Sequence, residues 1–317
     1  MKVLITGGAG FIGYHLAQEW SKSGAKVYLL DNFSRGVEDE ELAQLLSRDN
    51  VTLINADILS DNIPHNDYDF IYHLAAIIGV ANVLNQPFDV LKYNTELTIK
   101  TIELAQKQKN LKRILFASTS EVYAGTLKYF TMEIPTPEST PLTVTDLEHP
   151  RTTYMLSKIY GEALIIHSGL TYTIFRPHNV FGPRMGMAHV IPELLKKAYS
   201  LPEGELLPVF SPGHTRTFCF ISDAVYMLKK MAELDECQNE VLNLGQQENE
   251  ISMRSLAEII LRLVDKNAGI EENEETQGSP TRRCPNMNKT KSLLGALPNT
   301  SLEDGINQTY EWYKKQF

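Results

Sequence analysis

Two groups of polar residues in this chain have the types and spacing of a proton-transfer site. Tyr154 and Lys158 stand four positions apart, so in a helix they share one face. A lysine ammonium beside a phenol stabilises the phenolate, so a tyrosine with a reference pKa of about 10 can act as a base at neutral pH. Tyr-x-x-x-Lys alone is common on ordinary helix surfaces, so this interpretation needs support from the rest of the chain.

The second group is Thr119-Ser120-Glu121, which follows the apolar residues 114–117 almost directly. Such a short, nearly all-apolar run predicts a buried strand. In open α/β sheets ligands bind at the carboxyl ends of strands. The three side chains are therefore expected to face a bound ligand.

A glycine-rich turn supplies the support that the tyrosine and lysine need. Residues 6–13 lie between an apolar run at residues 2–5 and a helical pattern that begins at Phe11. Gly7, Gly10 and Gly13 permit a tight turn, a close approach of the backbone to a pyrophosphate, and packing of the helix on the sheet. The anion then sits on free N–H groups at the positive end of the helix dipole. Because both the strand and the helix are present, we predict a dinucleotide-binding turn.

Asp31 indicates which dinucleotide binds. It ends the second predicted strand, eighteen residues after Gly13. A carboxylate there can accept hydrogen bonds from both hydroxyls of an adenosine ribose and would repel a 2′-phosphate, which favours NAD over NADP. Two observations leave alternatives open: Arg35 could hold a phosphate, and Asp31 could merely cap a turn with Asn32.

Composition and charge exclude several classes of protein. The formal charge of −9 over 317 residues argues against a nucleic-acid-binding surface. The cysteines at 219, 237 and 284 are odd in number and lack CxxC spacing, which favours neither a disulfide framework nor a metal site. No apolar run approaches the roughly 20 residues of a membrane span, and the first strand leaves no room for a signal peptide. We therefore expect a cytoplasmic protein with neither a nucleic-acid nor a membrane partner.

The order of strand and helix patterns predicts an α/β fold with a Rossmann-type, doubly wound parallel sheet. Apolar runs at residues 51–54, 69–74 and 113–117 alternate with helical patterns, the longest over residues 88–107. Beyond Arg176, prolines break this rhythm. We predict an NAD-binding domain at residues 1–176 with a return segment at about 215–245, and a smaller, irregular, mainly substrate-binding region at residues 177–317. Residues 271–275, rich in glutamate, are expected to form a solvated loop.

With these motifs the chain resembles the extended short-chain dehydrogenase/reductase family, which contains nucleotide-sugar epimerases, dehydratases and decarboxylases. The resemblance covers nearly the whole length. The matching segments are Gly7-Gly8-Ala9-Gly10-Phe11-Ile12-Gly13, Asp31-Asn32, Asp57-Ile58, His73-Leu74-Ala75-Ala76, Asn94, Thr119-Ser120-Glu121, Tyr154 with Lys158, Arg176-Pro177-His178-Asn179-Val180-Phe181-Gly182-Pro183-Arg184 and Arg216-Thr217-Phe218.

The resemblance implies that NAD is the cofactor and that one set of residues binds it. Gly7, Gly10 and Gly13 would hold the pyrophosphate, Asp31 with Asn32 the adenosine ribose, and Asp57 with Ile58 the adenine. The full set implied for the cofactor is Gly7, Gly10, Phe11, Ile12, Gly13, Asp31, Asn32, Asp57, Ile58, Leu74, Ala75, Ala76, Asn94, Tyr154, Lys158 and Pro177.

The resemblance also implies a nucleotide-diphosphate sugar as substrate. Asn179 and Arg216 would contact its diphosphate, and Val190 joins the substrate-binding set. Either Arg282 or Arg283 is a further candidate. Cationic side chains are physically sensible there because no glycine turn holds this second diphosphate.

The implied chemistry begins with oxidation of the sugar at C4 and has no net redox change. Tyr154 would be the base on the 4-hydroxyl, Lys158 would hold the nicotinamide ribose, and Thr119 would bind the same sugar oxygen. Hydride passes to NAD and later returns, so the cofactor is regenerated on the enzyme.

Glu121 favours one branch of the family, because the order Thr-Ser-Glu looks like UDP-glucuronate decarboxylases and GDP-mannose-type 4,6-dehydratases. There the glutamate assists chemistry around C5 as an acid or base. Simple 4-epimerases carry a small side chain at this position, and dTDP-glucose dehydratases usually carry aspartate where this chain has Ser120. A 4-epimerase, a keto-sugar reductase, a catalytically silent NAD-binding protein, and a Glu121 that only orients its loop remain alternatives.

Relatives commonly dimerise through two helices of each subunit, which here correspond to residues 88–107 and 154–167. Ile99, Ile102, Ile159 and Ile166 are available for that contact, although the same positions could belong to the core. A homodimer is therefore expected.

Overall fold

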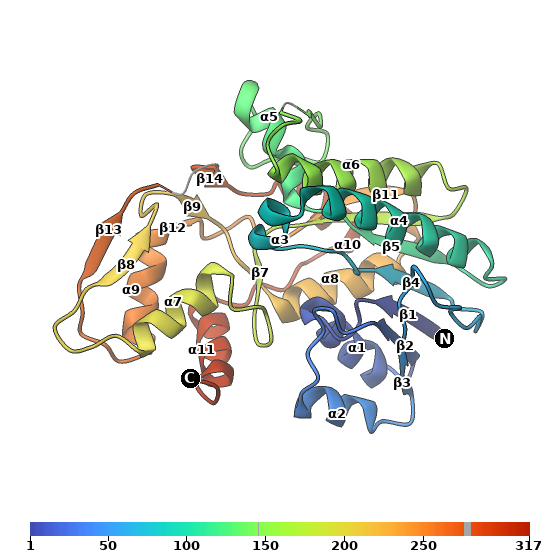
Figure 1. Cartoon of the computed structure of the whole chain (residues 1–317), viewed down its shortest axis with the longest axis horizontal. Coiled ribbons are helices and arrows are strands. Elements are labelled where there is room, and N and C mark those ends of the chain that lie inside the picture. Colours follow the sequence, from blue (N-terminus) through green and yellow to red (C-terminus); the bar gives the residue numbers. More distant parts are fainter. Residues whose placement is uncertain (145, 276–279) are drawn as a thin grey trace.

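One parallel sheet forms the centre of the molecule (Figure 1). The computed structural model describes residues 1–144, 146–275 and 280–317. Seven strands pair in the order β11-β6-β5-β4-β1-β2-β3, and every neighbouring pair is parallel. Their bounds are β1 Lys2–Thr6, β2 Lys26–Asp31, β3 Val51–Asn55, β4 Phe70–His73, β5 Arg113–Ala117, β6 Tyr172–Pro177 and β11 Glu240–Leu244. This order confirms the predicted Rossmann-type fold.

Helices cover both faces of this sheet, which explains why its strands are apolar almost throughout. Helices α1 (Phe11–Lys22) and α8 (Ile221–Glu233) lie on one face, and α4 (Pro87–Gln106) and α6 (Arg151–Ile166) lie on the other (Figure 1). Successive side chains of a strand point to opposite faces. In β1, accordingly, Val3 and Ile5 join the hydrophobic cluster on the α1 side, whereas Leu4 joins the cluster on the α4 side.

The remaining helices and strands lie outside the large sheet and its four covering helices. The helices are α2 Glu40–Leu46, α3 Val80–Asn85, α5 Ala124–Tyr129, α7 Val190–Tyr199, α9 Met253–Leu263, α10 Asn288–Leu294 and α11 Leu302–Tyr313, with 3-10 turns η1 Ser120–Tyr123 and η2 Asp235–Cys237. The strands are β7 Val180–Phe181, β8 Leu207–Phe210, β9 Thr215–Arg216, β10 Cys219–Phe220, β12 Ile251–Ser252, β13 Ile270–Asn273 and β14 Arg282–Arg283.

Beyond Arg176 the chain returns to the large sheet before it completes the smaller region. Helix α8 packs beside α1, and β11 forms the edge strand next to β6. The other strands of this half form small sheets, one of them with the order β12-β9-β14. The division into residues 1–176 and 177–317 stays a prediction.

The expected solvated loop at residues 271–275 is partly wrong, because residues 270–273 form β13 beside β8. This two-stranded sheet leaves Glu271 and Glu272 exposed, so the glutamates remain solvated within a strand. No helix in the described ranges has both the length and the apolar character needed to cross a membrane.

Candidate active site

The glycine turn has the shape of a phosphate cradle. Gly7 has a φ of +69°, and a methyl group on it would come within 3.0 Å of the backbone nitrogen of Ala75. A methyl group on Gly13 would overlap the turn itself, within 2.8 Å of the α-carbon of Gly8. Gly10 caps α1 without any side-chain acceptor, which leaves the N–H groups of its first turn open to an anion. These residues therefore fit the diphosphate of a dinucleotide.

Asp31 closes the turn from the end of β2. Its carboxylate accepts hydrogen bonds from the backbone nitrogens of Ala9 and Phe33, each at 2.9 Å. Two such bonds leave lone pairs on both oxygens, so the carboxylate can still accept the two hydroxyls of a ribose. Asn32 donates a hydrogen bond to Asp57 at 3.1 Å, which joins the ends of β2 and β3 next to this position.

The segment after β4 lies against the turn. Thr6 accepts hydrogen bonds from the backbone nitrogens of Leu74 and Ala75 through its hydroxyl, each at 3.2 Å. Asn94 binds the backbone of Ile77 in both directions, donating at 3.0 Å and accepting at 2.7 Å. The buried Asn94 side chain therefore fixes the loop after β4, and its contact with a cofactor stays a prediction.

The predicted catalytic pair lies on α6 and faces β5. Lys158 is 4% exposed and donates a hydrogen bond from Nζ to the carbonyl of Ala117 at 2.8 Å. The same Nζ lies 5.9 Å from the centre of the Tyr154 ring. The hydroxyl of Thr119 lies close enough to the phenol of Tyr154 to lower its pKa. Tyr154, Lys158 and Thr119 are thus brought together as the sequence predicts.

Electrostatics in this site differ from the sequence expectation. Burial raises the pKa of Tyr154, and the nearby carboxylate of Glu121 raises it further, while Thr119 and Arg35 act in the opposite direction. Burial also lowers the pKa of Lys158 to about 8, with Glu162 opposing the shift. The expected depression of the tyrosine pKa by Lys158 is therefore absent from this arrangement, in which the ammonium binds a carbonyl rather than the phenol.

A buried ion pair fixes α6 against the sheet. Arg176 on β6 binds Glu162 on α6 with Nη2 to Oε2 at 2.7 Å, and Ser118 donates to the same carboxylate at 2.5 Å. Both charged side chains are almost completely buried, so the pair is held in one geometry. This contact sets the position of the helix that carries Tyr154 and Lys158.

Thr119-Ser120-Glu121 forms a capped turn at the end of β5. The hydroxyl of Thr119 accepts a hydrogen bond from the backbone nitrogen of Glu121 at 3.2 Å, which caps η1. The cap directs Glu121 toward Arg283, and the carboxylate and guanidinium lie 2.6 Å apart. Glu121 keeps 38% of its side chain exposed, so a ligand can still reach it.

Strand β14 explains why Arg283 rather than Arg282 enters the site. Adjacent side chains of a strand point in opposite directions. Arg282 turns away and binds Glu250 at 2.8 Å, in an exposed position. Of the two predicted candidates, the structure therefore places Arg282 outside the arginine cluster of the site and Arg283 inside it.

Three arginines surround Glu121. Arg283 lowers the pKa of Glu121 most, burial opposes this, and Arg151 and Arg216 lower it further. Arg216, on β9, pairs in register with Arg283, on β14. The Arg216 guanidinium donates a hydrogen bond to the carbonyl of Pro280 at 2.6 Å. Burial and the neighbouring Arg283 lower the pKa of Arg216 to about 10. The site is therefore strongly positive around one carboxylate.

The other predicted substrate residues lie near this cluster or begin a helix beyond it. Asn179 donates a hydrogen bond to the carbonyl of Thr217 at 2.9 Å, directly after Arg216. Val190 is the partly exposed first residue of α7. Pro177, which is predicted to bind the cofactor, ends β6 beside Leu244 of β11. Their contacts with substrate or cofactor stay predictions.

Sequence reasoning missed Arg151 and the orientation of Arg35. Arg151 starts α6 one turn before Tyr154, and this i, i+3 spacing was a usable signal. Arg35 interacts electrostatically with Tyr154, and no sequence pattern indicates that contact because a loop determines it.

The match to a family model accounts for this combination of turn, tyrosine and lysine. Residues 3–245 match the model of the NAD-dependent epimerase/dehydratase family. The chain belongs to this family. It is accordingly an NAD-dependent enzyme that modifies nucleotide sugars, and the residues at the glycine turn fit the cofactor.

Individual relatives cover the whole chain. It is 34% identical to the UDP-N-acetyl-α-D-glucosaminuronate decarboxylase of Bacillus cytotoxicus, over 99% of this chain and 98% of that protein. It is 33% identical to UDP-glucuronic acid decarboxylase 1 of Xenopus tropicalis, over 99% of this chain and 72% of the relative. The crystal structure of UDP-glucuronic acid 4-epimerase from Bacillus cereus with UDP-glucuronic acid and NAD superposes with a TM-score of 0.82, at 26% identity and with 100% of both chains covered.

Proposed function

We propose that this enzyme decarboxylates a UDP-linked hexuronate through transient oxidation at C4, with Tyr154 as the base. The observation that carries this proposal is the ion pair between Glu121 and Arg283 beside Tyr154. It places an acid or base and a carboxylate-binding cation where the sugar is expected. The decarboxylases of Bacillus cytotoxicus and Xenopus tropicalis among the relatives support the same reaction.

The charge of the site suits a uronate better than a neutral hexose. A nucleotide hexose brings only its diphosphate, for which Arg216 is a partner. A uronate adds a carboxylate at C6 and needs a second cation, and Arg283 offers a guanidinium that can bind a carboxylate through two hydrogen bonds. Arg151, which also acts on Glu121, adds to the positive field.

The first step needs Tyr154, Thr119 and Lys158. The phenolate of Tyr154 takes the proton from O4, and the Thr119 hydroxyl, which lies near the phenol, can hold the same oxygen. Bound NAD supplies the hydride acceptor and later the donor, together with a positively charged ring that favours the phenolate. Lys158, fixed on Ala117, is available to the nicotinamide ribose.

The second step removes the carboxylate. Oxidation at C4 makes the C6 carboxylate part of a β-keto acid, so the bond between C5 and C6 breaks and its electrons move into an enolate at C4. CO2 leaves, and C5 needs a proton. The substrate carboxylate competes with Glu121 for Arg283. A Glu121 that loses its cation has a higher pKa, so it can take up a proton from solvent and deliver it to C5. Reduction at C4, with proton return from Tyr154, completes the cycle.

One alternative has a specific observation in its favour. The 4-epimerase from Bacillus cereus was crystallised with UDP-glucuronic acid, so a cation for a carboxylate also suits an epimerase of uronates. A 4,6-dehydratase has less support, because it acts on a sugar that carries a leaving hydroxyl at C6 and needs no carboxylate-binding cation. The presence of Glu121 favours decarboxylation over epimerisation.

A substrate panel tests the proposal directly. The purified protein is incubated with UDP-, GDP-, CDP- and dTDP-hexoses and with UDP-glucuronate and UDP-N-acetylglucosaminuronate, and the products are measured by mass spectrometry. We expect loss of CO2 from a UDP-uronate with no stoichiometric consumption of cofactor. An isomer of unchanged mass would show an epimerase, and stoichiometric oxidation of NADH or NADPH would show a reductase.

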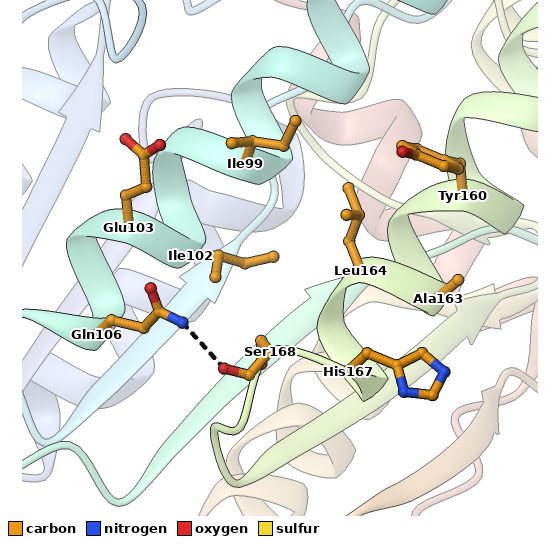
Figure 2. A pocket seen from close by; sticks show the side chains of 9 residues that line it. All are labelled: Ile99, Ile102, Glu103, Gln106, Tyr160, Ala163, Leu164, His167 and Ser168. Carbon is orange, nitrogen blue, oxygen red and sulfur yellow. Dashed lines mark hydrogen bonds between the residues drawn. The ribbon is translucent and has the colours of Figure 1, made fainter.

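We also infer a homodimer through α4 and α6. These helices pack side by side, and a surface groove of about 430 Å³ lies between them on their outer face (Figure 2). Ile99 and Tyr160 line it and are 36% and 50% exposed. Ile102, by contrast, is 8% exposed and belongs to the core cluster. Exposed apolar side chains on adjacent helices support a protein partner on this face. A cytoplasmic location and the absence of a nucleic-acid partner stay predictions from composition.

A further inference from the structure

Arg35 lies on the loop between β2 and α2, and the structure fixes this loop on both sides of it. A methyl group on Gly36 would come within 2.9 Å of the side chains of Ala9 and Asp31. Arg184 holds the following residues through the carbonyl of Val37 at 3.1 Å. The backbone of Arg35 is therefore anchored next to the start of α1, where the glycine turn ends.

The guanidinium of Arg35 reaches toward the catalytic end of the site. Burial raises the pKa of Tyr154, and the charge of Arg35 opposes that rise. Burial lowers the pKa of His189, at the start of α7, and Arg35 lowers it further. Asp31, at the ribose end, is not among the groups that act on Arg35. The backbone of Arg35 therefore lies beside the cofactor turn, and its charge acts on Tyr154 and His189 at the substrate end of the site.

Arg35 has no anionic partner of its own. In the part of the chain that the structure describes, no carboxylate lies within ion-pair distance of it and no carbonyl accepts a hydrogen bond from it. Arg35 is exposed, so its charge is available to an anion that binds beside the glycine turn.

The glycine turn leaves a charge deficit that Arg35 can fill. Residues 6–13 contain no lysine or arginine, and the single lysine of α1, Lys22, is in its last turn. A helix N-terminus contributes only about half of a positive charge. The diphosphate of a dinucleotide carries two negative charges, so a nearby cation would stabilise it through charge-assisted hydrogen bonds.

We propose that Arg35 binds the diphosphate of NAD together with the N–H groups of α1, and thereby retains the cofactor through successive cycles. Retention suits this reaction because each cycle returns the cofactor to its starting state. Arg35 is therefore not a reader of a 2′-phosphate: that group would lie beside Asp31, whereas the guanidinium points toward Tyr154. Its role does not depend on whether the enzyme decarboxylates or epimerises its sugar.

Cofactor binding to the full chain, stripped of bound nucleotide, tests this role by calorimetry without any sugar substrate. The variants are Arg35→Gln and Arg35→Lys. The matched control is Arg48→Gln, which removes the same charge at the far end of α1, where Arg48 binds the Ser21 hydroxyl at 3.2 Å. The ligands are NAD, ADP-ribose, NADP and adenosine.

We expect Arg35→Gln to lower the affinity for NAD and the affinity for ADP-ribose by the same factor, about ten- to a hundredfold. A loss of this size is typical when a charge-assisted hydrogen bond is removed. Adenosine, which has no phosphate, should bind as before, the preference for NAD over NADP should not change, and Arg35→Lys should recover most of the affinity. Unchanged NAD affinity in Arg35→Gln would overturn the proposal. A loss confined to NADP, or an equal loss in Arg48→Gln, would overturn it as well.

Discussion

The guanidinium of Arg283 lies 2.6 Å from the carboxylate of Glu121, although 162 positions separate the two residues in the chain. Strand β14 makes this contact possible through its position beside β9 and through the segment that follows it. The backbone of Thr136 pairs with that segment by bonds to Cys284 and Asn286, at 2.8 and 2.9 Å. Thr136, in the segment between η1 and α6, therefore holds the backbone that follows Arg283 in place, and this keeps Arg283 facing Glu121.

Replacing Arg283 by alanine should abolish recognition of the uronate carboxylate. We expect kcat/KM to fall by about a hundredfold or more, the range for removing one member of a charged hydrogen bond that bound substrate covers. Arg282→Ala is the control, because Arg282 binds Glu250 in an exposed position. It should stay within a few fold of the parent. Equal losses in the two variants would contradict the assignment of Arg283 to the substrate.

Replacing Glu121 by glutamine should separate the two halves of the reaction. The amide preserves shape and hydrogen bonding but cannot exchange a proton. Oxidation at C4 should therefore continue while the later step slows, so the cofactor accumulates in its reduced form and a 4-keto sugar appears in mass spectra. Glu258→Gln changes the same group at an exposed position on α9 and should turn over normally. Full activity in Glu121→Gln, with a product that differs from substrate only at C4, would show an epimerase instead.

Tyr154→Phe should fold and bind NAD but lose turnover, because it removes only the hydroxyl that accepts the proton. Loss of a positioned general base costs about 10²- to 10⁴-fold in rate. Tyr160→Phe, on the exposed side of the same helix, is the matched control and should keep parental activity. Activity of Tyr154→Phe within a few fold of the parent would exclude Tyr154 as the base.

Much of the fold could be predicted because its signals are local. The apolar runs at residues 2–5 and 113–117 predict buried strands without any knowledge of their partners, and β1 and β5 appear there. Gly13 could be identified because its position requires the absence of a side chain. The prediction for residues 271–275 is partly wrong because a run of glutamates indicates solvent exposure but does not exclude a strand. Strand β13 keeps its glutamates exposed and still pairs with β8.

Site residues could be predicted where the spacing along a helix or the end of a strand determines their position. They could not be predicted where packing between distant parts of the chain determines it. Tyr154, Lys158 and Thr119 follow from spacing and from the end of β5. The choice between Arg282 and Arg283 depends on which side chain of the two-residue strand β14 points toward Glu121. No local sequence pattern determines that direction. The raised pKa of Tyr154 depends on burial and on Glu121, and both are tertiary properties.

Lys158 should make stability depend on pH above neutrality. Burial lowers its pKa from 10.5 to about 8, so the native state loses the proton before the unfolded state does. The unfolded chain binds more protons between these values, and stability therefore rises as pH increases from about 8 to 10.5, by roughly 3 kcal/mol for this shift. Below pH 8 both states are protonated and the cost of burial is fully present.

Urea unfolding of the parent and of Lys158→Met at pH 7, 9 and 10 measures this contribution. The free energy of unfolding of the parent should gain on that of the variant as pH rises, because methionine has no proton to lose. Lys112→Met, at an exposed position, should follow the parent curve. Parallel curves for the parent and Lys158→Met would contradict the lowered pKa.

Assembly through α4 and α6 can be tested at Ile99, which is exposed on the outer face and lines the groove between the helices (Figure 2). A glutamate there would place a charge in an apolar contact and should convert a dimer into a monomer. Leu206→Glu is the matched control, because Leu206 is exposed far along the chain, beside β8. Light scattering at micromolar concentration should show dimers for the parent and for Leu206→Glu, and monomers for Ile99→Glu. Ile102→Glu is unsuitable as a test, because Ile102 belongs to the core and the change would unfold the chain. A monomeric parent protein, or an Ile99→Glu variant that stays dimeric, would contradict this interface.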